Sequence, residues 1–531
     1  MRSIYICILS MVLLFGCADV INVEPENDTT FTNYFKTTKD AEALLTSLQL
    51  DIRSMMCETG EQNPHLFAGE MIDSAVSRYI SGPRTLDYTY YVNKSWEKFY
   101  RVINSADLIL DNLHRFPLTE EELKPWELQA CFAKGVAYFL LAQRWGEVPI
   151  TKGTTYFGKL ARSSVHDVLE EATKWALKAL ELPVYEELVD DEGKSRTTKQ
   201  YGSKGAAAAL LAHLYAWRAT IEEQLEYLVE AERYCTMIIE NQAGNYALAA
   251  SPEAVCTEVM KRGSRESIWE VHRTLEDDAI DSYSSAYASE VYVGIPTYYT
   301  NINQYYNLML FKSHVREMFD PEDRRREAYF WGVEADSLFT VQTADKILKC
   351  VLSYGTNDHV VGKFRIKERK ETYINKFRYG IIETDPYWGT QRYLGMDMNK
   401  VIWRLADIML LRAECRARQN NPDAVIDLNE IRKRAYGNDE HKYTAAEGDL
   451  QLAIFREREK ELLFEDHRFY DIRRNGIDYV RRELPEAFGK LTDQDIKDGA
   501  LYMDIALKAM TNNDLMRHNV YWNKFLQKQR V

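Results

Sequence analysis

The feature that most constrains the fold is a pair of helical patterns late in the chain. Apolar residues recur every three or four positions in the first pattern, at Ile402, Leu405, Ala406, Met409, Leu410 and Ala413. They recur in the second pattern at Val425, Leu428, Ile431 and Ala435. From Ile402 to Ala435 the unit is 34 residues long, which is the period of a tetratricopeptide repeat. Each apolar stripe needs a partner that buries it, so the pattern predicts helix pairs stacked into a helical-repeat core.

The residues between and after these stripes predict where the helices end and begin. Asn421 is a residue type that caps helices, and Pro422 suits a first helical turn. Gly437 suits the left-handed position that closes a helix.

An earlier segment has the same paired character. The run from Gly205 to Tyr215 is rich in alanine, which lets two helices approach closely, and a second pattern follows at Glu226–Glu240. The two pairs share little sequence identity, so the repeats are divergent. Helices are predicted at Thr38–Met56, Ser95–Phe116, Glu120–Trp145, Ser164–Leu180, Lys204–Ala219, Gln224–Glu240, Val401–Gln419, Asp423–Tyr436 and Leu450–Arg474. Strand patterns are few and short, and the predicted fold class is mostly α.

The N-terminus has the form of an export signal. Met1-Arg2-Ser3 gives a positive start, and Ile4 to Phe15 is an apolar run too short to cross a bilayer. Leu14-Phe15-Gly16-Cys17 fits a bacterial lipobox, in which the Cys17 thiol accepts a lipid. The alternative is a cytosolic protein with an apolar first strand and an incidental cysteine. We expect residues 1–16 to be a signal peptide and residues 17–36 a lipidated tether, with membrane contact through the lipid only.

Charge and cysteine content bear on the class of protein. The formal net charge of −14 would repel a polyanion, which argues against a nucleic-acid-binding protein. Besides Cys17, the mature chain contains Cys57, Cys131, Cys235, Cys256, Cys350 and Cys415. Cys131, Cys235 and Cys415 lie in apolar helical patterns, which favours buried thiols, although an exported location permits disulfides.

The region from about residue 244 to 399 is irregular and rich in tyrosine. Residues 283–306 contain seven tyrosines in 24 positions, whereas the average of 34 in 531 residues gives about 1.5. This composition predicts a loop-rich layer over the helical scaffold, and loops on rigid scaffolds commonly carry binding sites.

Several stretches together resemble the SusD/RagB family of nutrient-binding lipoproteins. They occur in the family's order, at Cys17–Pro25, Phe31–Phe35, Arg144–Ile150, Lys204–Ala212, Arg404–Glu414, Leu428–Ala435 and Glu457–Arg474. The resemblance spans nearly the whole chain. It departs at Cys131–Gly135, where the family usually has Arg-Phe-Leu-Arg-Ala, and at Asn512–Val531, which replaces a Pro-rich and Asn-rich ending.

The resemblance implies a single SusD-like domain over residues 37–531, built of tetratricopeptide-like repeats with a loop-rich ligand-binding layer. It implies a non-enzymatic lipoprotein of the cell outer membrane, exposed at the surface. Such a protein binds oligosaccharide or peptide nutrients and hands them to a TonB-dependent SusC-like transporter. No catalytic residue, cofactor or metal ligand is predicted.

Two motifs have a chemical interpretation beside a structural one. Gly153–Lys159 has the spacing of a phosphate-binding loop, but Leu160 stands where Ser or Thr is needed for magnesium, so we interpret it as a plain loop. Glu461 and Glu465 are spaced to lie on one helix face as an acid/base pair. Arg468 and Asp471, three positions apart, instead indicate a structural ion-pair network, which we favour. A surface glycosidase and a helical-repeat adaptor that binds only proteins are the alternative functions.

Aromatic residues are the candidates for ligand binding. Their faces attract the C–H faces of sugars and the side chains of peptides, while nearby polar groups bind hydroxyls or amides. The predicted ligand-binding residues are Asp73, Arg78, Tyr79, Tyr88, Tyr283, Tyr287, Tyr292 and Trp388. Tyr91 belongs to the same group, and ordinary packing is the competing interpretation for any single tyrosine.

Overall fold

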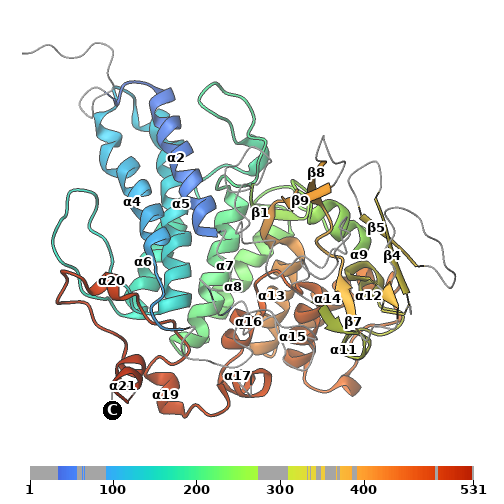
Figure 1. Ribbon diagram of the computed structural model, residues 1–531. Coiled ribbons are helices and arrows are strands. Elements are labelled where there is room, and N and C mark those ends of the chain that lie inside the picture. The colour runs from blue at the N-terminus through green and yellow to red at the C-terminus, as the bar shows by residue number, and fades with distance from the viewer. Residues whose placement is uncertain are drawn as a thin grey trace, which may run out of the picture.

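Helices that pack in pairs are the main elements of the described part of this protein, whose structure is a computed structural model (Figure 1). The model describes residues 34–56, 63, 65, 91–272, 309–331, 333–334, 337–342, 348–352, 366–367, 371–384, 391–484 and 488–528. The successive pairs are α2 (Thr38–Met56) with α4 (Glu97–Asn112), α5 (Glu120–Trp145) with α6 (Val165–Ala179), α7 (Lys204–Ile221) with α8 (Tyr227–Ile239), and α13 (Leu405–Arg418) with α14 (Ala424–Tyr436). The two helices of each pair pack together, and neighbouring pairs lie side by side. The mostly α, tetratricopeptide-like prediction is therefore confirmed.

The helix ends follow local sequence signals. Helix α5 begins with a capping box, in which Glu122 N donates to Thr119 Oγ1 and Thr119 N donates to Glu122 Oε2. Gly437 closes α14 with a φ of 76°, as predicted. Helix α14 begins only at Ala424, so Pro422 lies before the first helical turn and Asp423, rather than Asn421, takes the N-cap position. The Asn421 side chain still accepts from the backbone N of Asp423 at 3.0 Å.

Helix α5 lies in the middle of the first half of the core. A Cβ atom at Gly135 would lie 3.1 Å from Leu210 Cδ2 and 3.2 Å from the backbone N of Ala176, so α5 runs tightly against both α6 and α7. The alanines of α7 at positions 206–209 are fully buried. Small side chains thus allow the close helix approach that the sequence predicts.

The chain beyond α14 forms shorter helices. They are α15 (Leu450–Glu461), α16 (Arg468–Arg474), α17 (Ile477–Glu483), α19 (Asp493–Lys497), α20 (Leu507–Met510) and α21 (Val520–Lys528). Helix α21 lies in the segment that departs from the family's usual ending. Its Trp522 is fully buried, and the indole Nε1 donates to the backbone O of Tyr502 at 2.7 Å. This buried indole fixes the C-terminal segment to the core.

Short antiparallel strands lie beside the helices. Strand β1 (Ser267–Val271) pairs with β10 (Lys400–Arg404), and Trp269 stands opposite Trp403. The other strands are β2 (Met309–Phe311), β3 (Phe330–Trp331), β4 (Ser337–Gln342), β5 (Leu348–Leu352), β6 (Ile366–Lys367), β7 (Glu371–Ile374), β8 (Gly380–Thr384) and β9 (Gln391–Met396). They form the sheets β2-β7-β3, β5-β4-β6 and β8-β9, near the short helices α9 (Pro252–Ala254), α11 (Lys312–Met318) and α12 (Arg325–Tyr329). The described part of the predicted loop layer therefore contains small sheets.

Two helix predictions are wrong in part. Residues 401–404 belong to β10 rather than to the helix that follows, because they pair with β1. Leu450–Arg474 is not one helix, since α15 ends at Glu461 and α16 begins at Arg468. Phe464 and Asp466 between them have positive φ values of 61° and 67°, a conformation that cannot continue a helix.

Candidate functional site

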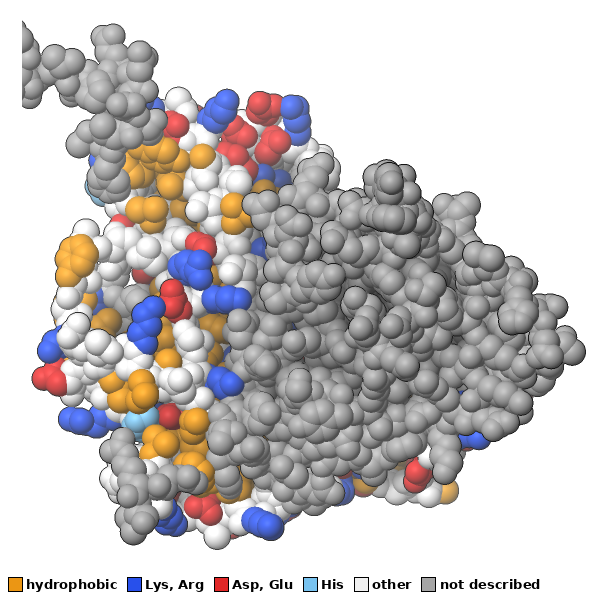
Figure 2. Space-filling view, in the orientation of Figure 1, with side chains coloured by type: hydrophobic (Ala, Val, Ile, Leu, Met, Phe, Trp, Pro, Cys, Tyr) orange, Lys and Arg blue, Asp and Glu red, His pale blue; other side chains and the backbone are white. Residues whose placement is uncertain are grey.

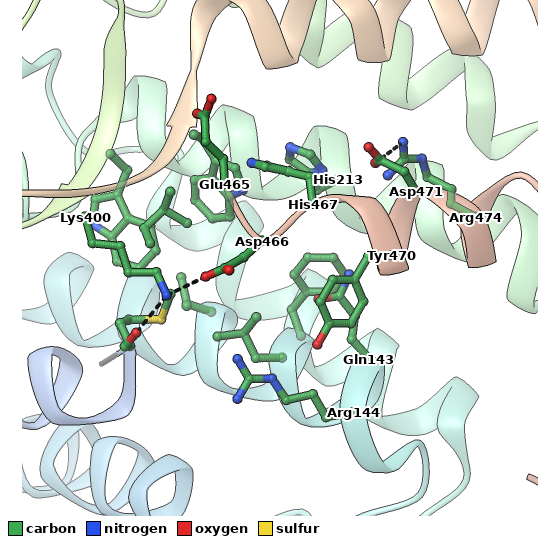
Figure 3. Close-up of a pocket in the computed structure, with 17 residues that line it drawn as sticks. Gln143, Arg144, His213, Lys400, Glu465, Asp466, His467, Tyr470, Asp471 and Arg474 are labelled. Carbon is green, nitrogen blue, oxygen red and sulfur yellow. Dashed lines mark hydrogen bonds and ion pairs between the residues drawn. The ribbon is translucent and has the colours of Figure 1, made fainter. Parts of the chain in front are cut away.

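A small polar cavity lies where the helix pairs meet strand β10 and the turn between α15 and α16 (Figure 3). Helix α5 contributes Gln143 and Arg144, α7 contributes His213, and β10 contributes Lys400 and Trp403. The turn after α15 and helix α16 contribute Glu465, Asp466, His467, Tyr470, Asp471 and Arg474. Residues distant in sequence thus meet at one place in the core.

Lys400 holds one edge of this cavity together. Its Nζ donates to the backbone O of Met56, the last residue of α2, at 3.0 Å. The same Nζ lies 2.7 Å from Asp466 Oδ2, in an ion pair that Figure 3 draws as a dashed line. Both side chains are largely buried, so the pair joins α2 to the turn after α15 in a poorly solvated place.

A second polar group surrounds Asp407 of α13. His213 Nε2 lies 2.9 Å from Asp407 Oδ2, and Arg458 Nη2 donates to Asp407 Oδ1 at 2.8 Å. Burial alone would raise the pKa of Asp407, but His213, His467 and Arg458 hold that pKa well below its ordinary value. The pKa of His467 is lowered, chiefly by burial. Asp407 is therefore a carboxylate, and His467 favours the neutral imidazole.

Aromatic rings complete the lining. The His213 ring stacks on Trp403 with a centroid distance of 5.7 Å and an angle of 20°, and Trp403 contacts Trp269 of β1. Tyr470 is half-buried, and its hydroxyl accepts from Asn63 Nδ2 at 3.5 Å. Lys400, Trp403 and His213 were not predicted as site residues. The one sequence signal was a histidine inside the alanine-rich run of α7.

The size of the cavity limits what it can hold. Its volume is about 90 Å³, whereas pockets for drug-sized ligands span roughly 300–1,000 Å³. It has room for water or a small polar group, and it offers a Lys–Asp pair and imidazole nitrogens as hydrogen-bonding partners.

All eight predicted ligand-binding residues lie outside the described residues. They are Asp73, Arg78, Tyr79, Tyr88, Tyr283, Tyr287, Tyr292 and Trp388, and the predicted lipidation site Cys17 lies outside as well. Tyr91 is described, and it is a core residue. It is 1% exposed, and it packs edge to face against Phe488 at 6.2 Å. For Tyr91 the packing interpretation is therefore the right one.

Glu461 and Glu465 belong to a buried ion-pair network. Arg404 Nη1 donates to Glu461 Oε1 at 2.9 Å, and Arg404 Nη2 donates to Glu465 Oε1 at 2.7 Å. Burial opposes ionisation of both carboxyls, but the surrounding cations lower the pKa of each. The alternative of an acid/base pair on one helix face is not supported, because α15 ends at Glu461 and both groups are held as carboxylates.

The ion pair predicted between Arg468 and Asp471 is also absent from the pairs that the described residues form. Arg468 instead donates to Glu459 Oε1 at 2.5 Å and to Glu483 Oε2 at 3.1 Å. Asp471 accepts from Arg458 and from Arg474. The structural interpretation of the charged cluster was correct, but Arg468 pairs with α15 and α17 rather than within its own helix.

The loop with phosphate-binding spacing surrounds a carboxylate of the protein itself. Backbone N and Oγ1 of Thr154 donate to Asp111 Oδ2 at 2.6 and 2.8 Å, and Lys159 pairs with Asp514 at 2.9 Å. Gly153, with a φ of +86°, makes the tight approach to Asp111. This arrangement fits the interpretation as a plain loop.

The described cysteines are free and buried: Cys131, Cys235, Cys256 and Cys415. Burial raises the pKa of the Cys131 thiol to about 12, so it stays protonated. The buried-thiol prediction is confirmed for Cys131, Cys235 and Cys415, while the side chains of Cys57 and Cys350 lie outside the described part.

In the described part of the chain, no group of three or more His, Cys, Asp or Glu side chains is placed to hold a metal ion. Nor does any helix among the residues that are described have the length and apolar character to cross a membrane.

The stacked helix pairs and their buried polar centre define a helical-repeat protein of the tetratricopeptide type. Comparison with known families identifies it further. The SusD family model matches residues 265–526, and a related model described as "Starch-binding associating with outer membrane" matches residues 22–216. The chain belongs to the SusD family.

Individual relatives agree with this assignment. SusD-like protein P25 of Formosa agariphila is 24% identical over 417 residues, covering 73% of this chain and 70% of that protein. SusD-like protein P2 of the same organism is 22% identical over 505 residues, covering 88% and 89%. The crystal structure of a SusD homolog from Bacteroides thetaiotaomicron matches with a TM-score of 0.68 at 20% identity, covering 92% of this chain and 98% of that one. NanU of B. fragilis matches with a TM-score of 0.63 at 18% identity, covering 93% and 99%.

Proposed function

We propose that this protein is a surface-exposed lipoprotein of the outer membrane that binds nutrient glycans or peptides. It delivers them to a TonB-dependent, SusC-like transporter. The lipid on Cys17 anchors it, and no cofactor takes part.

Membership of the SusD family is the observation that carries the proposal. Two family models lie in order along residues 22–216 and 265–526, and the description of the first of these segments names starch binding and association with the outer membrane. A glycan is therefore the first ligand class to test. The lipobox at Leu14–Cys17 supports the anchored location independently of the family.

The proposed ligand surface is formed by the aromatic segments around Tyr79, Tyr88, Tyr283 and Trp388. Met56, which borders the polar cavity, directly precedes the segment 57–90 in the sequence. In this proposal the protein captures its nutrient by binding it, without a chemical reaction. If the protein closes over its transporter, the ligand must bind the closed state more tightly than the open one.

The main rival is a surface glycosidase. The buried carboxylates Glu461 and Glu465 do not support it, because retaining and inverting glycosidases need one carboxyl that is protonated at working pH. An adaptor that binds only proteins is the second rival, and it predicts no affinity for small ligands.

Calorimetric titration of the mature protein with maltooligosaccharides, other glycan fragments and peptide mixtures tests the proposal. We expect saturable binding of one class without release of reducing ends or cleavage products. Co-purification with a tagged transporter from solubilised outer membranes should accompany it. Turnover of the bound glycan would support the glycosidase, and transporter binding with no small-ligand affinity would support the adaptor.

A further inference from the structure

The loop between α5 and α6 presents an aromatic side chain almost entirely to solvent. Phe157 is 93% exposed, and its neighbour Tyr156 is 40% exposed, with Lys152 Nζ 4.9 Å from the centre of the Tyr156 ring. In Figure 1 this loop projects from the left side of the bundle, and Figure 2 shows apolar side chains at that edge of the molecule, with Lys and Arg side chains nearby. Two adjacent aromatic rings at the tip of a loop gain free energy when an apolar phase covers them.

The loop is ordered although its tip is bare. On the side that leaves α5, backbone N and Oγ1 of Thr154 both bind Asp111 of α4. On the side that returns to α6, Asn513 Nδ2 donates to the backbone O of Leu160 at 3.0 Å. These contacts hold both sides of the loop, so Phe157 stays at the tip and loses little conformational entropy when it meets another surface.

The loop lies at the end of the bundle where the membrane tether joins the fold. Asp111, which binds Thr154, is in the last turn of α4. Phe35, near the end of the predicted lipidated tether, packs edge to face on Phe116 with a centroid distance of 5.3 Å. Asp111 and Phe116 are five positions apart, which is about 8–10 Å along the helix axis. The tether and the loop therefore reach the same end of α4.

The loop is basic, whereas the chain as a whole is acidic with a net charge of −14. Residues 151–163 contain Lys152, Lys159 and Arg162 and no Asp or Glu. The Arg162 side chain is 6% exposed and turned inward, so Lys152 and Lys159 are the cations at the loop surface. Lys159 forms a pair with Asp514 in which both side chains are exposed, and water screens such a pair. Lysines beside apolar aromatic side chains are typical of protein surfaces that lie at an anionic bilayer.

We propose that Phe157 and Tyr156 rest in the headgroup region of the membrane that anchors the protein, where Lys152 and Lys159 contact anionic lipid headgroups. This inference rests on the proposed lipid anchor at Cys17. The sequence predicts membrane contact through the lipid only, and the loop adds a second contact. A lipid at the end of a tether leaves the orientation of the fold open, whereas the second contact turns the tether end of α4 toward the bilayer.

Collisional quenching of tryptophan by brominated lipids tests the proposal. The mature chain, residues 18–531, is ligated at its N-terminus to a synthetic diacyl lipid and reconstituted in vesicles of phosphatidylcholine and phosphatidylglycerol. Phe157→Trp adds one tryptophan to the ten of the parent, and the difference between the two emissions reports the loop tip. We expect this added tryptophan to be quenched, because the headgroup region borders the brominated acyl chains.

Leu225→Trp is the matched control. Helix α5 starts beside the end of α4, and α7 runs alongside α5 in the same direction, since Gly202 binds Gln129 and Gly135 faces Leu210. Leu225 follows α7 and therefore lies at the other end of the bundle, where it is 58% exposed. Quenching should be roughly twofold or more stronger at the loop than at this control. Equal quenching of the two added tryptophans would overturn the contact.

Charge reversal tests the headgroup contacts. Lys152→Glu with Lys159→Glu, made in the Phe157→Trp protein, should reduce the quenching by roughly half or more. Both positions are exposed, so the fold is retained. Lys442→Glu with Lys490→Glu makes the same change in net charge at exposed positions outside the loop, and it should leave the quenching as it was. Equal quenching of the loop in vesicles of phosphatidylcholine alone would overturn the contact with anionic headgroups.

A protein partner is the competing occupant of the loop tip. If the tryptophan of Phe157→Trp is unquenched on lipid vesicles and its emission shifts to the blue only when the transporter is added, the tip binds the transporter and the membrane contact is overturned. The synthetic lipid replaces the natural one in these experiments, so their outcome does not depend on lipidation of Cys17. Failure of the loop contact and failure of the proposed anchor are therefore distinguishable.

Discussion

Arg404 and Glu461 form a buried ion pair that joins strand β10 to the end of helix α15. Arg404 Nη1 lies 2.9 Å from Glu461 Oε1, and each side chain is 1% exposed. Arg404 also donates to Glu266 and Glu465, while Arg434 donates to Glu461 from α14. The network therefore links four segments that are far apart in the chain, in the part of the fold that holds the polar cavity.

Arg404→Met should strongly destabilise the protein, because it removes the cation that compensates the buried negative charges of Glu266 and Glu465. Breaking a buried pair from one side costs about 3–5 kcal/mol of unfolding free energy. Urea denaturation followed by circular dichroism measures this. Arg481→Met is the control, since Arg481 and its partner Asp493 are both exposed, and it should unfold like the parent. Equal stability of the Arg404 variant would contradict a structural role for the network.

Stability should fall as the pH drops below about 4.5. The folded-state pKa is lowered well below the ordinary value for Asp407 and Glu461, where cations outweigh the opposing effect of burial. Such groups stabilise the fold above their unfolded pKa, and that contribution is lost as the pH falls through the folded pKa. Glu270 has the opposite effect on the pH dependence of stability, because burial raises its pKa and the fold therefore favours its protonated form.

Melting temperatures between pH 6 and pH 3 measure this dependence. The fall should be shallower in Arg404→Met, since the variant lacks a cation that lowers the pKa of Glu461. A melting temperature that rises on acidification would contradict the ionised network.

Cys17→Ala should release the protein from membranes, because the proposed lipid is its anchor. Metabolic labelling with a radioactive fatty acid and fractionation of the cells measure this. Cys131→Ala is the control, since its buried thiol has no role in lipidation, and it should keep both label and membrane location. Label retained on the Cys17 variant would defeat the lipobox interpretation.

Alanine at Tyr88, Tyr283, Tyr287, Tyr292 or Trp388 should weaken ligand binding while leaving the helical circular dichroism intact. Each lost stacking contact should cost about 1 kcal/mol, or roughly fivefold in affinity. Phe157→Ala is a matched control, because this aromatic side chain is 93% exposed on the loop after α5. If all five variants bind like the parent, the ligand site lies elsewhere, and if all five unfold, these are packing residues.

The polar cavity illustrates why site residues escape prediction from sequence. His213, Lys400 and Asp466 come from α7, β10 and the turn after α15, and no spacing pattern connects them. The charged cluster at 457–474 can be recognised in the sequence. In the structure, however, Arg468 pairs with Glu459 and Glu483 rather than with the nearby Asp471. Local spacing predicts only partners on the same helix, whereas burial selects partners from any segment that packs nearby.

The sequence by itself determined the helices whose apolar stripes and end signals are local. Helices α2 and α5 have the predicted bounds, because each is a long uninterrupted helical pattern and α5 has a complete capping box. Only the tertiary structure decided residues 401–404 and 462–467. The first segment is a strand because β1, more than a hundred residues away, supplies its hydrogen bonds. The second is a turn because Lys376 binds the carbonyls of Glu461 and Leu463 while Lys400 holds Asp466, and such partners outweigh a local preference for helix.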